Sequence, residues 1–355
     1  MSLRHRIRMA IGATAIAVIA LAAPSAEAGE TDPVASFYKG KTVQLVVGYS
    51  TGGGYDMYAR LLARYMGRHI PGNPLVVPQN MPGAGSLRAV GYLYNAAPKD
   101  GTVMGIFSRG AAFAPLLDAK VPIQFDATKL NWLGSATDEV SVCGFWHTAG
   151  IKTWKDMLSK PSVLGGTGAG SDTDVYAHTI EHVFHAPFKL VTGFAGSGDV
   201  VLAFERGETQ GRCGWSWSSL MARNKVEYDR GDIVLVVQLG LRKHEALANV
   251  PLITELAPDA KTEAALELIF SRQSMARPFA MPPGVPPERL AAMRQAFNET
   301  MKDPELLAEA AKLELEIHPV DGASLDALVK RLYASPPEVV AMAREALGDQ
   351  NAPDK

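Results

Sequence analysis

The sequence predicts an α/β fold of two domains, each a mostly parallel β-sheet with flanking helices. Three strand-then-helix units follow one another between residues 43 and 110. The same pattern of strand, glycine-rich turn and helix begins again at residue 163. Setting aside an apparent leader of 28 residues leaves 327 of the 355 residues. Because single hydrophobic cores rarely extend beyond about 250–300 residues, that length indicates two domains.

The N-terminus has the pattern of a secretory signal peptide. Arg4, Arg6 and Arg8 form a basic region, and residues 9–23 are apolar. A small-x-small cleavage pattern ends at Ala28. The apolar run is too short for a stable membrane span. We therefore expect cleavage near Ala28 and an exported protein, with an uncleaved N-terminal anchor as the alternative.

The charge of the mature chain is slightly acidic. Loss of the leader removes three arginines and one glutamate, which changes the formal net charge from −2 to −4. This composition argues against a nucleic-acid partner, which would require a basic surface. It is compatible with an anionic small ligand, because backbone N–H groups can bind an anion locally.

Two cysteines are present, Cys143 and Cys213. Each lies beside a predicted strand in the middle third of the chain, so a bridge between them is geometrically feasible. A disulfide is typical of an exported protein. Two buried free thiols are the alternative.

The first strand-then-helix unit contains a candidate anion site. Residues 43–47 are apolar and mostly β-branched, which predicts a buried strand, and apolar residues recur at helical spacing from Met57. Between them, Gly52, Gly53 and Gly54 allow the backbone to approach a bound group. The helix N-terminus supplies unpaired N–H groups and a partial positive charge. Glycine-rich turns without any ligand also occur in many α/β proteins.

The next two units bring further polar segments to the same edge. Residues 75–78 and 102–107 are predicted strands, and a glycine-rich turn at 80–86 opens the helix between them. In parallel sheets, ligands bind beyond the carboxyl ends of the strands. Three segments should therefore converge there: residues 49–56, residues 83–86, and Ser108 with Arg109.

The rest of the chain alternates strands and helices in the same way. Residues 131–146 are predicted to be extended, and residues 163–184 repeat the strand, turn and helix of the first unit. Further strands are expected at 189–192, 210–217, 233–239 and 277–281. Further helices are expected at 154–158, 200–206, 262–270, 288–302, 304–313, 325–334 and 336–347.

Six short motifs, each weak alone, occur in an order that is specific. They are Phe-Tyr-Lys-Gly-Lys at 37–41, Gly-Gly-Gly-Tyr-Asp at 52–56 with Ala-Arg at 59–60, Asn-Met-Pro-Gly-Ala-Gly-Ser at 80–86, Ala-Pro-Lys-Asp-Gly at 97–101, Gly-Thr-Gly-Ala-Gly-Ser at 166–171 and Pro-Gly-Val-Pro at 283–286. With these motifs behind a leader, the mature chain resembles the periplasmic substrate-binding receptors of the tripartite tricarboxylate transporter family.

The resemblance implies a two-domain periplasmic binding protein of the type II-like clamshell kind. Domain 1 would comprise residues 29–142 plus 277–355, and domain 2 residues 143–276, with two crossover strands as the hinge. A small organic carboxylate, classically a dicarboxylate or tricarboxylate, would bind in the interdomain cleft without chemical change. The receptor would then deliver it to membrane permease subunits, and no cofactor is implied.

The resemblance also implies which residues bind the ligand. In the first domain, one carboxylate of the ligand would contact the glycine-rich turn formed by Tyr49, Ser50, Thr51, Gly52, Gly53 and Gly54. Ser86 and Ser108 would also line this domain. Asp56 would hold that turn as a helix cap. In the second domain the lining residues would be Thr167, Gly168, Ser171 and Asp199.

Two further residues are candidates with an open alternative. Arg109, at a strand end, could pair with a carboxylate or form a surface ion pair. The stretch Gly-Trp-Ser-Trp-Ser at 214–218 departs from the family pattern, and Trp215 near the cleft would favour a flat or aromatic acid. A tryptophan in a strand is, however, more often a core or rim residue.

A secreted α/β hydrolase-like enzyme acting on a small acid or ester is the rival interpretation. The stretch 214–218 has the first glycine and the serine of a nucleophile elbow, but Ser218 stands where the final glycine is required. A metal site is conceivable because His178, His182 and His185 lie at i, i+4 and i+7 of a predicted helix. Such histidines are more often solvated. We therefore predict no catalytic and no metal-binding residues.

Overall fold

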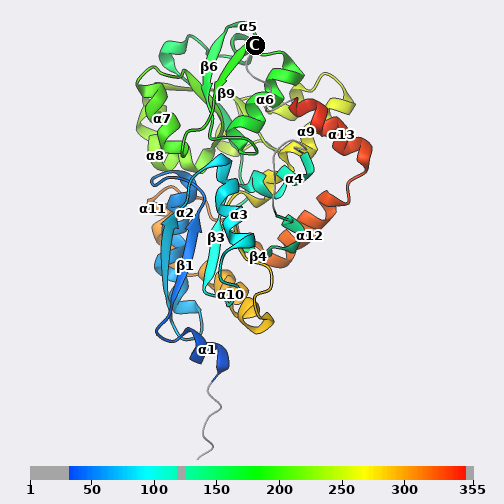
Figure 1. Cartoon of the computed structure of the whole chain (residues 1–355). Coiled ribbons are helices and arrows are strands. Elements are labelled where there is room, and N and C mark those ends of the chain that lie inside the picture. Colours follow the sequence, from blue (N-terminus) through cyan, green and yellow to red (C-terminus); the bar gives the residue numbers. More distant parts are fainter. Residues whose placement is uncertain (1–31, 118–124, 349–355) are drawn as a thin grey trace, which may run out of the picture. The chain divides into compact units, whose positions relative to one another are not determined.

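Two mixed β-sheets organise the chain in the computed structural model, which describes residues 32–117 and 125–348 (Figure 1). The first sheet has the strand order β11-β4-β10-β3-β1-β2, and the second has the order β7-β6-β8-β5-β9. We call the first sheet, with the helices that pack on it, the first lobe. We call the second sheet, with its helices, the second lobe. The predicted signal peptide lies outside the described residues. The predicted domain boundaries near residues 142 and 277 stay predictions.

The first lobe contains the N-terminal strand-then-helix units. Its strands are β1 (Thr42–Val47), β2 (Leu75–Asn80), β3 (Val103–Ile106), β4 (Asn131–Ser135), β10 (Pro278–Met281) and β11 (Val320–Asp321). Its helices are α1 (Pro33–Tyr38), α2 (Gly54–Met66), α3 (Leu87–Asn95), α4 (Ala114–Leu117), α10 (Pro287–Thr300), α11 (Pro304–Lys312) and α12 (Gly322–Tyr333). The parallel pairs are β1 with β2 and β1 with β3, so the carboxyl ends of these strands lie at one edge.

The second lobe repeats this plan. Its strands are β5 (Ser141–Trp146), β6 (Ser162–Gly165), β7 (Phe188–Val191), β8 (Gly211–Ser216) and β9 (Ile233–Leu239). Its helices are α5 (Trp154–Ser159), α6 (Asp172–Phe184), α7 (Ser197–Glu205), α8 (Trp217–Arg230) and α9 (Ala260–Phe270). The strand β6 pairs in parallel with β7 and β8, whereas β5 is antiparallel to both β8 and β9.

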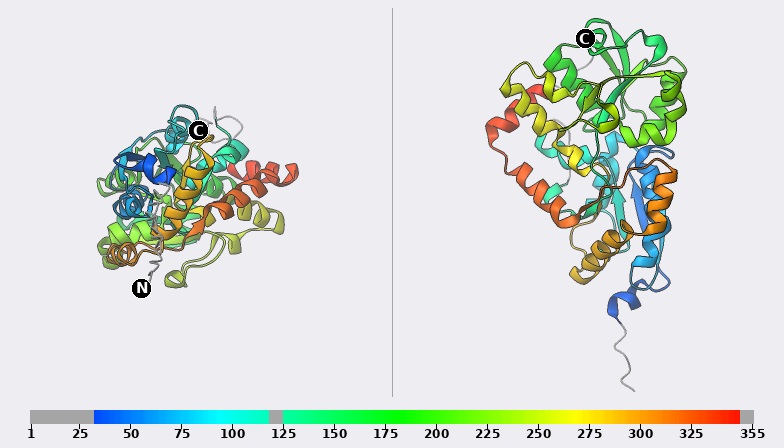
Figure 2. Two further views of the ribbon diagram at one scale, coloured as in Figure 1. Left: turned by 90° about the horizontal axis from the view of Figure 1, so that it is seen from below. Right: turned by 180° about the vertical axis from the view of Figure 1, so that it is seen from behind.

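The chain passes from one sheet to the other between β4 and β5, and it returns between β9 and β10. The C-terminal helices also connect the lobes, because α12 packs on β4 whereas α13 (Pro337–Leu347) packs on α9 and α6 (Figure 2). In each sheet the strands on the crossover segments add antiparallel pairs, which is why both sheets are mixed.

The cores form where the strand and helix periodicities predict. In α2, Tyr58, Leu61, Leu62 and Met66 are buried against the first sheet. In the second lobe, Cys143 of β5 and Cys213 of β8 form a disulfide between neighbouring strands, which decides between the two alternatives that the sequence left open. No helix in the described part of the chain is both long and apolar enough for a membrane span.

Among the described helices, three were not predicted: the short α1 and α4, and the longer α8. The predicted strand at 210–217 ends at Ser216, and α8 begins at Trp217. The alternation of large and small residues continues through Trp217 and suggests an extended chain. The helix buries only a narrow stripe, formed by Trp217, Leu220 and Asn224 with two serines, so its apolar periodicity is weak.

Candidate functional site

A cavity lies between the two lobes at the carboxyl ends of β1 and β3. The first lobe contributes Tyr49, Gly54, Tyr55, Arg109 and Arg277, and the second contributes Thr167, Asp172, Thr173, Ser197, Arg212, Gly214, Ser216 and Ser219. The cavity is nearly closed, with room for little more than a water molecule. This lining is polar throughout, apart from two tyrosine rings and the glycines, so the cavity suits a compact polar group.

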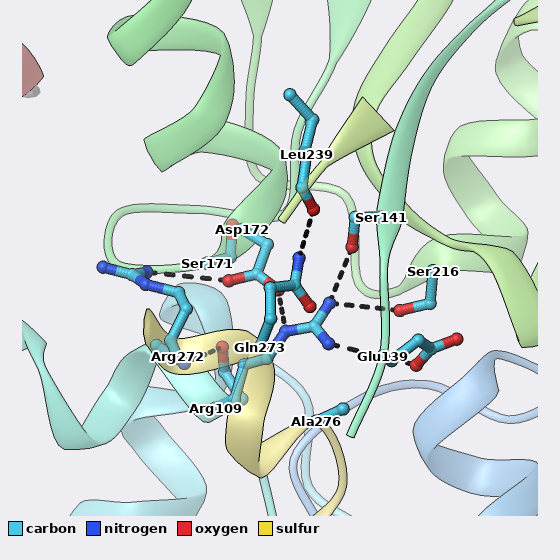
Figure 3. A network of polar contacts seen from close by, with 12 residues as sticks. Arg109, Glu139, Ser141, Ser171, Asp172, Ser216, Leu239, Arg272, Gln273 and Ala276 are labelled. Carbon is cyan, nitrogen blue, oxygen red and sulfur yellow. Dashed lines mark hydrogen bonds and ion pairs between the residues drawn. The ribbon is translucent and has the colours of Figure 1, made fainter. Parts of the chain in front are cut away.

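Arg109 connects the lobes through a buried ion pair. It follows β3, where Ser108 caps a short 3₁₀ helix that positions the arginine at the sheet edge. Its Nε atom donates to a carboxylate oxygen of Asp172, and its Nη2 atom donates to Ser141 at 2.9 Å and Ser216 at 3.1 Å (Figure 3). Burial opposes the charged form of this guanidinium, but Asp172 and neighbouring acidic groups outweigh burial and raise the pKa of Arg109.

Arg277 lies beside a second buried carboxylate. Its Nη2 atom is 2.9 Å from an oxygen of Glu139 and donates to Ser219 at 2.9 Å. Its guanidinium also lies over the rings of Tyr55 and Tyr58, each at 4.9 Å from the ring centroid. Its Nε atom has no hydrogen-bond partner within the described residues.

Arg212 of β8 differs from these two arginines. It is 2% exposed, and within the described ranges its Nη atoms donate only to the carbonyl and hydroxyl of Ser197, at 3.1 and 3.3 Å. Among the described residues it forms no ion pair, and its Nε atom has no partner. Its guanidinium lies over the ring of Trp215, 5.2 Å from the centroid. Burial lowers the pKa of Arg212 to about 10, so the side chain is still cationic at neutral pH.

Comparisons with known proteins agree with this architecture. No family model matches the sequence. A curated relative, the UPF0065 protein in gbd 5′ region of Cupriavidus necator, is 23% identical over 337 residues, which cover 89% of this chain and 90% of the relative. The solved periplasmic binding protein BugD aligns with a TM-score of 0.72 at 16% identity, covering 87% of this chain and 98% of its own.

A second solved structure shares the fold over a similar length. MatC from Rhodopseudomonas palustris, with bound malate, aligns with a TM-score of 0.67 at 17% identity, covering 87% of this chain and 99% of its own. The chain has the fold of the periplasmic binding proteins. The fold that the six motifs implied is therefore confirmed. In this periplasmic binding protein fold, the cavity lies between the two lobes.

The structure brings four of the predicted ligand-binding residues to the lining of the cavity: Tyr49, Gly54, Arg109 and Thr167. Gly53, Gly54 and Trp215 line a smaller neighbouring cavity, which shares Ser197 and Ser219 with the main one. Trp215 is 2% exposed and packs against Phe204 as well as Arg212. Its predicted role as a platform for an aromatic acid stays a prediction.

Other predicted residues hold the first turn in place. Asp56 lies in the first turn of α2 rather than at its N-cap, and it accepts hydrogen bonds from the Gly52 N–H at 2.8 Å and from Asn80 at 2.9 Å. Burial opposes its charge, but these bonds and one from Arg60 outweigh burial and lower the pKa of Asp56. Ser86 accepts from the Ser108 N–H at 3.1 Å, so both serines brace the turns.

The remaining predicted residues lie where the lobes meet. Ser50 donates to Asp199 at 2.6 Å across the lobes, and Asp199 and Thr51 line an outer groove. The Gly85 N–H donates to the Thr167 carbonyl at 3.1 Å, and Gly168 lies against Gly85. Ser171 is occupied by hydrogen bonds within its own turn, with Thr173 and Asp174.

Sequence reasoning missed two arginines and the acidic residue of the lining. Arg212 is a charged residue inside an otherwise apolar strand, next to Cys213, and that contrast was a usable signal. Arg277 directly precedes β10 and is likewise a charged residue next to an apolar strand. Asp172 is the first residue of α6, where an acidic residue is common because it interacts favourably with the helix dipole. Its ion pair with Arg109 could not be predicted from the sequence, because the two residues meet only in the folded chain.

The histidines of α6 lie away from the cavity. Potential metal ligands of His178, Glu181 and His182 lie within 4.8 Å of one another, whereas His185 ends the helix in a left-handed conformation. His182 is exposed, and one of its ring nitrogens already contacts the His178 carbonyl at 2.9 Å.

Proposed function

We propose that this chain is a periplasmic receptor that captures a small organic carboxylate between its lobes. It then presents the ligand to the membrane permease of a tripartite tricarboxylate transporter. The charge of the cavity supports this proposal, because Arg109, Arg212 and Arg277 are buried there and Asp172 is the one carboxylate among the lining residues. A buried cation without a counter-ion costs free energy, so an anionic ligand would stabilise the closed form.

Two further observations support the same function. MatC, which shares the fold, was solved with malate, a small carboxylate. The N-terminal pattern of basic residues, apolar run and small-x-small site is typical of export, which a periplasmic receptor requires. Both the cleavage near Ala28 and the partnership with permease subunits belong to this proposal.

The mechanism is binding without chemical change. The ligand first meets one lobe, and closure adds donors from the other lobe and excludes water. Its extra contacts in the closed form shift the population toward that form. The direct contacts between the lobes, from Ser50 to Asp199 and from Gly85 to Thr167, stabilise closure. A permease that contacts both lobes would recognise the closed receptor.

The lining favours a compact aliphatic acid over an aromatic one. Hydroxyl and guanidinium groups dominate the cavity, and little space is open within it. Trp215, which lines the smaller neighbouring cavity, has its ring covered by Arg212 and Phe204. An aromatic ligand would therefore have to displace more buried protein contacts than a short acid.

The hydrolase alternative lacks a general base at the candidate serine. The hydroxyl of Ser216 accepts a hydrogen bond from Arg109, whose guanidinium is already protonated and cannot take up a proton. Within residues 32–117 and 125–348, no histidine forms a hydrogen bond with this serine, whereas nucleophile activation usually requires an adjacent base. This observation favours binding over catalysis.

A thermal-shift screen tests the proposal. The leaderless chain would be heated with a panel of monocarboxylates, dicarboxylates, tricarboxylates and aromatic acids. A ligand at 100 times its Kd stabilises the folded state by about 2.7 kcal/mol, which raises the melting temperature measurably. We expect a rise with at least one short aliphatic acid. No shift with any acid, together with ester hydrolysis in a turnover assay, would contradict the proposal.

A further inference from the structure

Three potential metal ligands gather on one face of α6, away from the cavity. His178, Glu181 and His182 lie at positions i, i+3 and i+4 of this 13-residue helix, so their side chains project from the same face. Each offers one nitrogen or oxygen atom, and these three atoms lie within 4.8 Å of one another. Two histidines four residues apart on a helix are a known arrangement for binding zinc. The proposed carboxylate receptor uses none of these three side chains.

His178 and Glu181 already have the spacing of two ligands on one ion. The Nδ1 atom of His178 lies 3.3 Å from a carboxylate oxygen of Glu181. In a tetrahedral site with bonds of about 2.1 Å, two ligand atoms are about 3.4 Å apart. The side chain of His178 is 13% exposed and held by its surroundings, whereas that of Glu181 is 43% exposed. The carboxylate can therefore turn toward an ion bound at the imidazole.

The third ligand, His182, has one ring nitrogen fixed as a donor. Its Nδ1 atom lies 2.9 Å from the backbone carbonyl of His178. Because a carbonyl oxygen only accepts hydrogen bonds, the neutral ring carries its proton on Nδ1, and Nε2 keeps its lone pair. A contact from the other ring nitrogen to a carbonyl is usual for metal-bound histidines, since it fixes the tautomer and the orientation of the ring.

The surroundings of His182 are suited to a cation. The residue lines a surface hollow between α6, α9 and α13, together with Asp259, Lys261 and Glu345. Two carboxylates and one ammonium group give this hollow a negative formal charge, and Glu181 adds a further negative charge beside it. The hollow is open to solvent, so water molecules can fill the remaining coordination positions of an ion.

We infer that His178, Glu181 and His182 form a surface site for a divalent transition-metal ion of the zinc class. Two imidazoles and a carboxylate suit Zn²⁺ and Ni²⁺, whereas Mg²⁺ and Ca²⁺ require mainly oxygen ligands. From the sequence we predicted no metal-binding residue, because the spacing indicated only histidines on a solvated helix face. In the structure the third ligand is Glu181 rather than His185, which ends the helix in a left-handed conformation. The inference does not rest on the proposed function, since these residues do not line the cavity.

Isothermal titration calorimetry on the leaderless chain, prepared without an affinity tag and dialysed against a chelator, tests this inference. The probes are the chlorides of zinc, nickel, magnesium and calcium. We expect about one zinc or nickel ion to bind per chain, in competition with each other, and magnesium and calcium to bind about 100-fold more weakly or worse. His182→Gln should weaken zinc binding by about tenfold or more, because the ion loses an imidazole ligand. Glu181→Gln should weaken it by a smaller factor, because water can take the place of a carboxylate.

His185→Asn and His147→Gln are the matched controls. Each removes an exposed histidine that is not one of the three ligands, and asparagine tolerates the left-handed conformation at residue 185. Each should change the affinity for zinc by less than about twofold. Circular dichroism checks the fold of each variant.

Two results would overturn the inference: no saturable zinc binding by the unmodified chain, or unchanged zinc affinity in a folded His182→Gln variant. X-ray absorption on the zinc-loaded unmodified chain gives a test that needs no variant. It should show about two imidazole ligands on the ion. A shell of oxygen atoms alone would equally overturn the inference.

Discussion

Arg212 is a buried side chain whose proposed role in binding should come at a cost to stability. Its guanidinium is buried with no counter-ion among the described residues, and burial lowers its pKa to about 10. Replacement by methionine removes that desolvation cost, although it also leaves two acceptors of Ser197 unsatisfied. We therefore expect the melting temperature of ligand-free Arg212→Met to be equal to that of the unmodified chain or higher. Calorimetric melting checks this, and a loss above about 2 kcal/mol would indicate a structural role instead.

A titratable pair between the lobes predicts a pH dependence. His244 follows β9, and its Nε2 atom lies 3.0 Å from Glu316, which precedes β11. This hydrogen bond outweighs partial burial and raises the pKa of His244, with Glu245 and Glu139 also acting in that direction. The stabilisation is fully present below pH 6.5, the usual pKa of the unfolded chain, and is lost as the pH rises through the raised folded value.

We accordingly expect the free energy of unfolding in urea to fall as the pH rises from about 6.5 to 8.5. Glu316→Gln should flatten this slope, because the group that raises the pKa of His244 is removed. Glu314→Gln, an exposed change in the same loop, should leave the slope unaltered. An identical pH profile in the unmodified chain and Glu316→Gln would show that the pair does not contribute.

For single residues, the sequence predicted which side chains lie at the ends of strands and helices better than it predicted which side chains contact one another. Tyr49, Gly54 and Arg109 line the cavity because they end strands or begin a helix, and such positions can be predicted from periodicity. Arg212 and Arg277 were missed because a strand arginine is usually at the surface. Only the packing of β8 and β10 within the two sheets buries both.

At the scale of elements, closure depends on two glycine-rich turns that meet backbone to backbone. Gly85 has a φ of +57°, and a Cβ there would lie 2.6 Å from the Ala169 carbonyl and 2.8 Å from the Gly168 carbonyl. Gly85→Ala should therefore keep the lobes apart and weaken ligand binding by about tenfold or more, because the competent state becomes less populated.

Gly91→Ala is the matched control for that change. Gly91 lies on the neighbouring helix α3, and a Cβ there would meet nothing within 4 Å. Alanine at that helical position should stabilise the chain by up to about 1 kcal/mol and leave affinity unchanged. Calorimetric titration of both variants gives the comparison. Equal affinities would mean that the contact between these turns does not govern closure.

The disulfide gives a prediction for the second sheet. Cys143 and Cys213 are 70 residues apart in sequence and join β5 to β8. Removal of the bridge by alanine at both positions should lower the free energy of unfolding by about 2–4 kcal/mol, because the unfolded chain gains freedom. Urea unfolding with and without a reductant measures this for the unmodified chain. A double variant as stable as the oxidised chain would contradict the prediction.

Most elements were predictable, but their assignment to sheets was not. The sequence predicts residues 131–146 as one extended stretch, yet β4 joins the first sheet and β5 the second. The pairing partners of these strands are distant in sequence, since β4 pairs with β10 and β11, and β5 with β8 and β9. Local periodicity contains no information about such partners.

At the scale of the whole molecule, the proposed recognition site is built from both lobes. The first lobe contributes Arg109 and Arg277, and the second contributes Arg212 and Asp172. Neither lobe alone assembles the charge that would attract a carboxylate. Binding and closure are therefore one event in this account, and ligand affinity should respond to any change that separates the lobes.

A crystal structure of the leaderless chain with its tightest short aliphatic carboxylate tests this account most directly. We predict that the carboxylate of the ligand lies between the lobes, within hydrogen-bonding distance of a buried arginine of the cavity. A carboxylate bound outside the space between the lobes would contradict it.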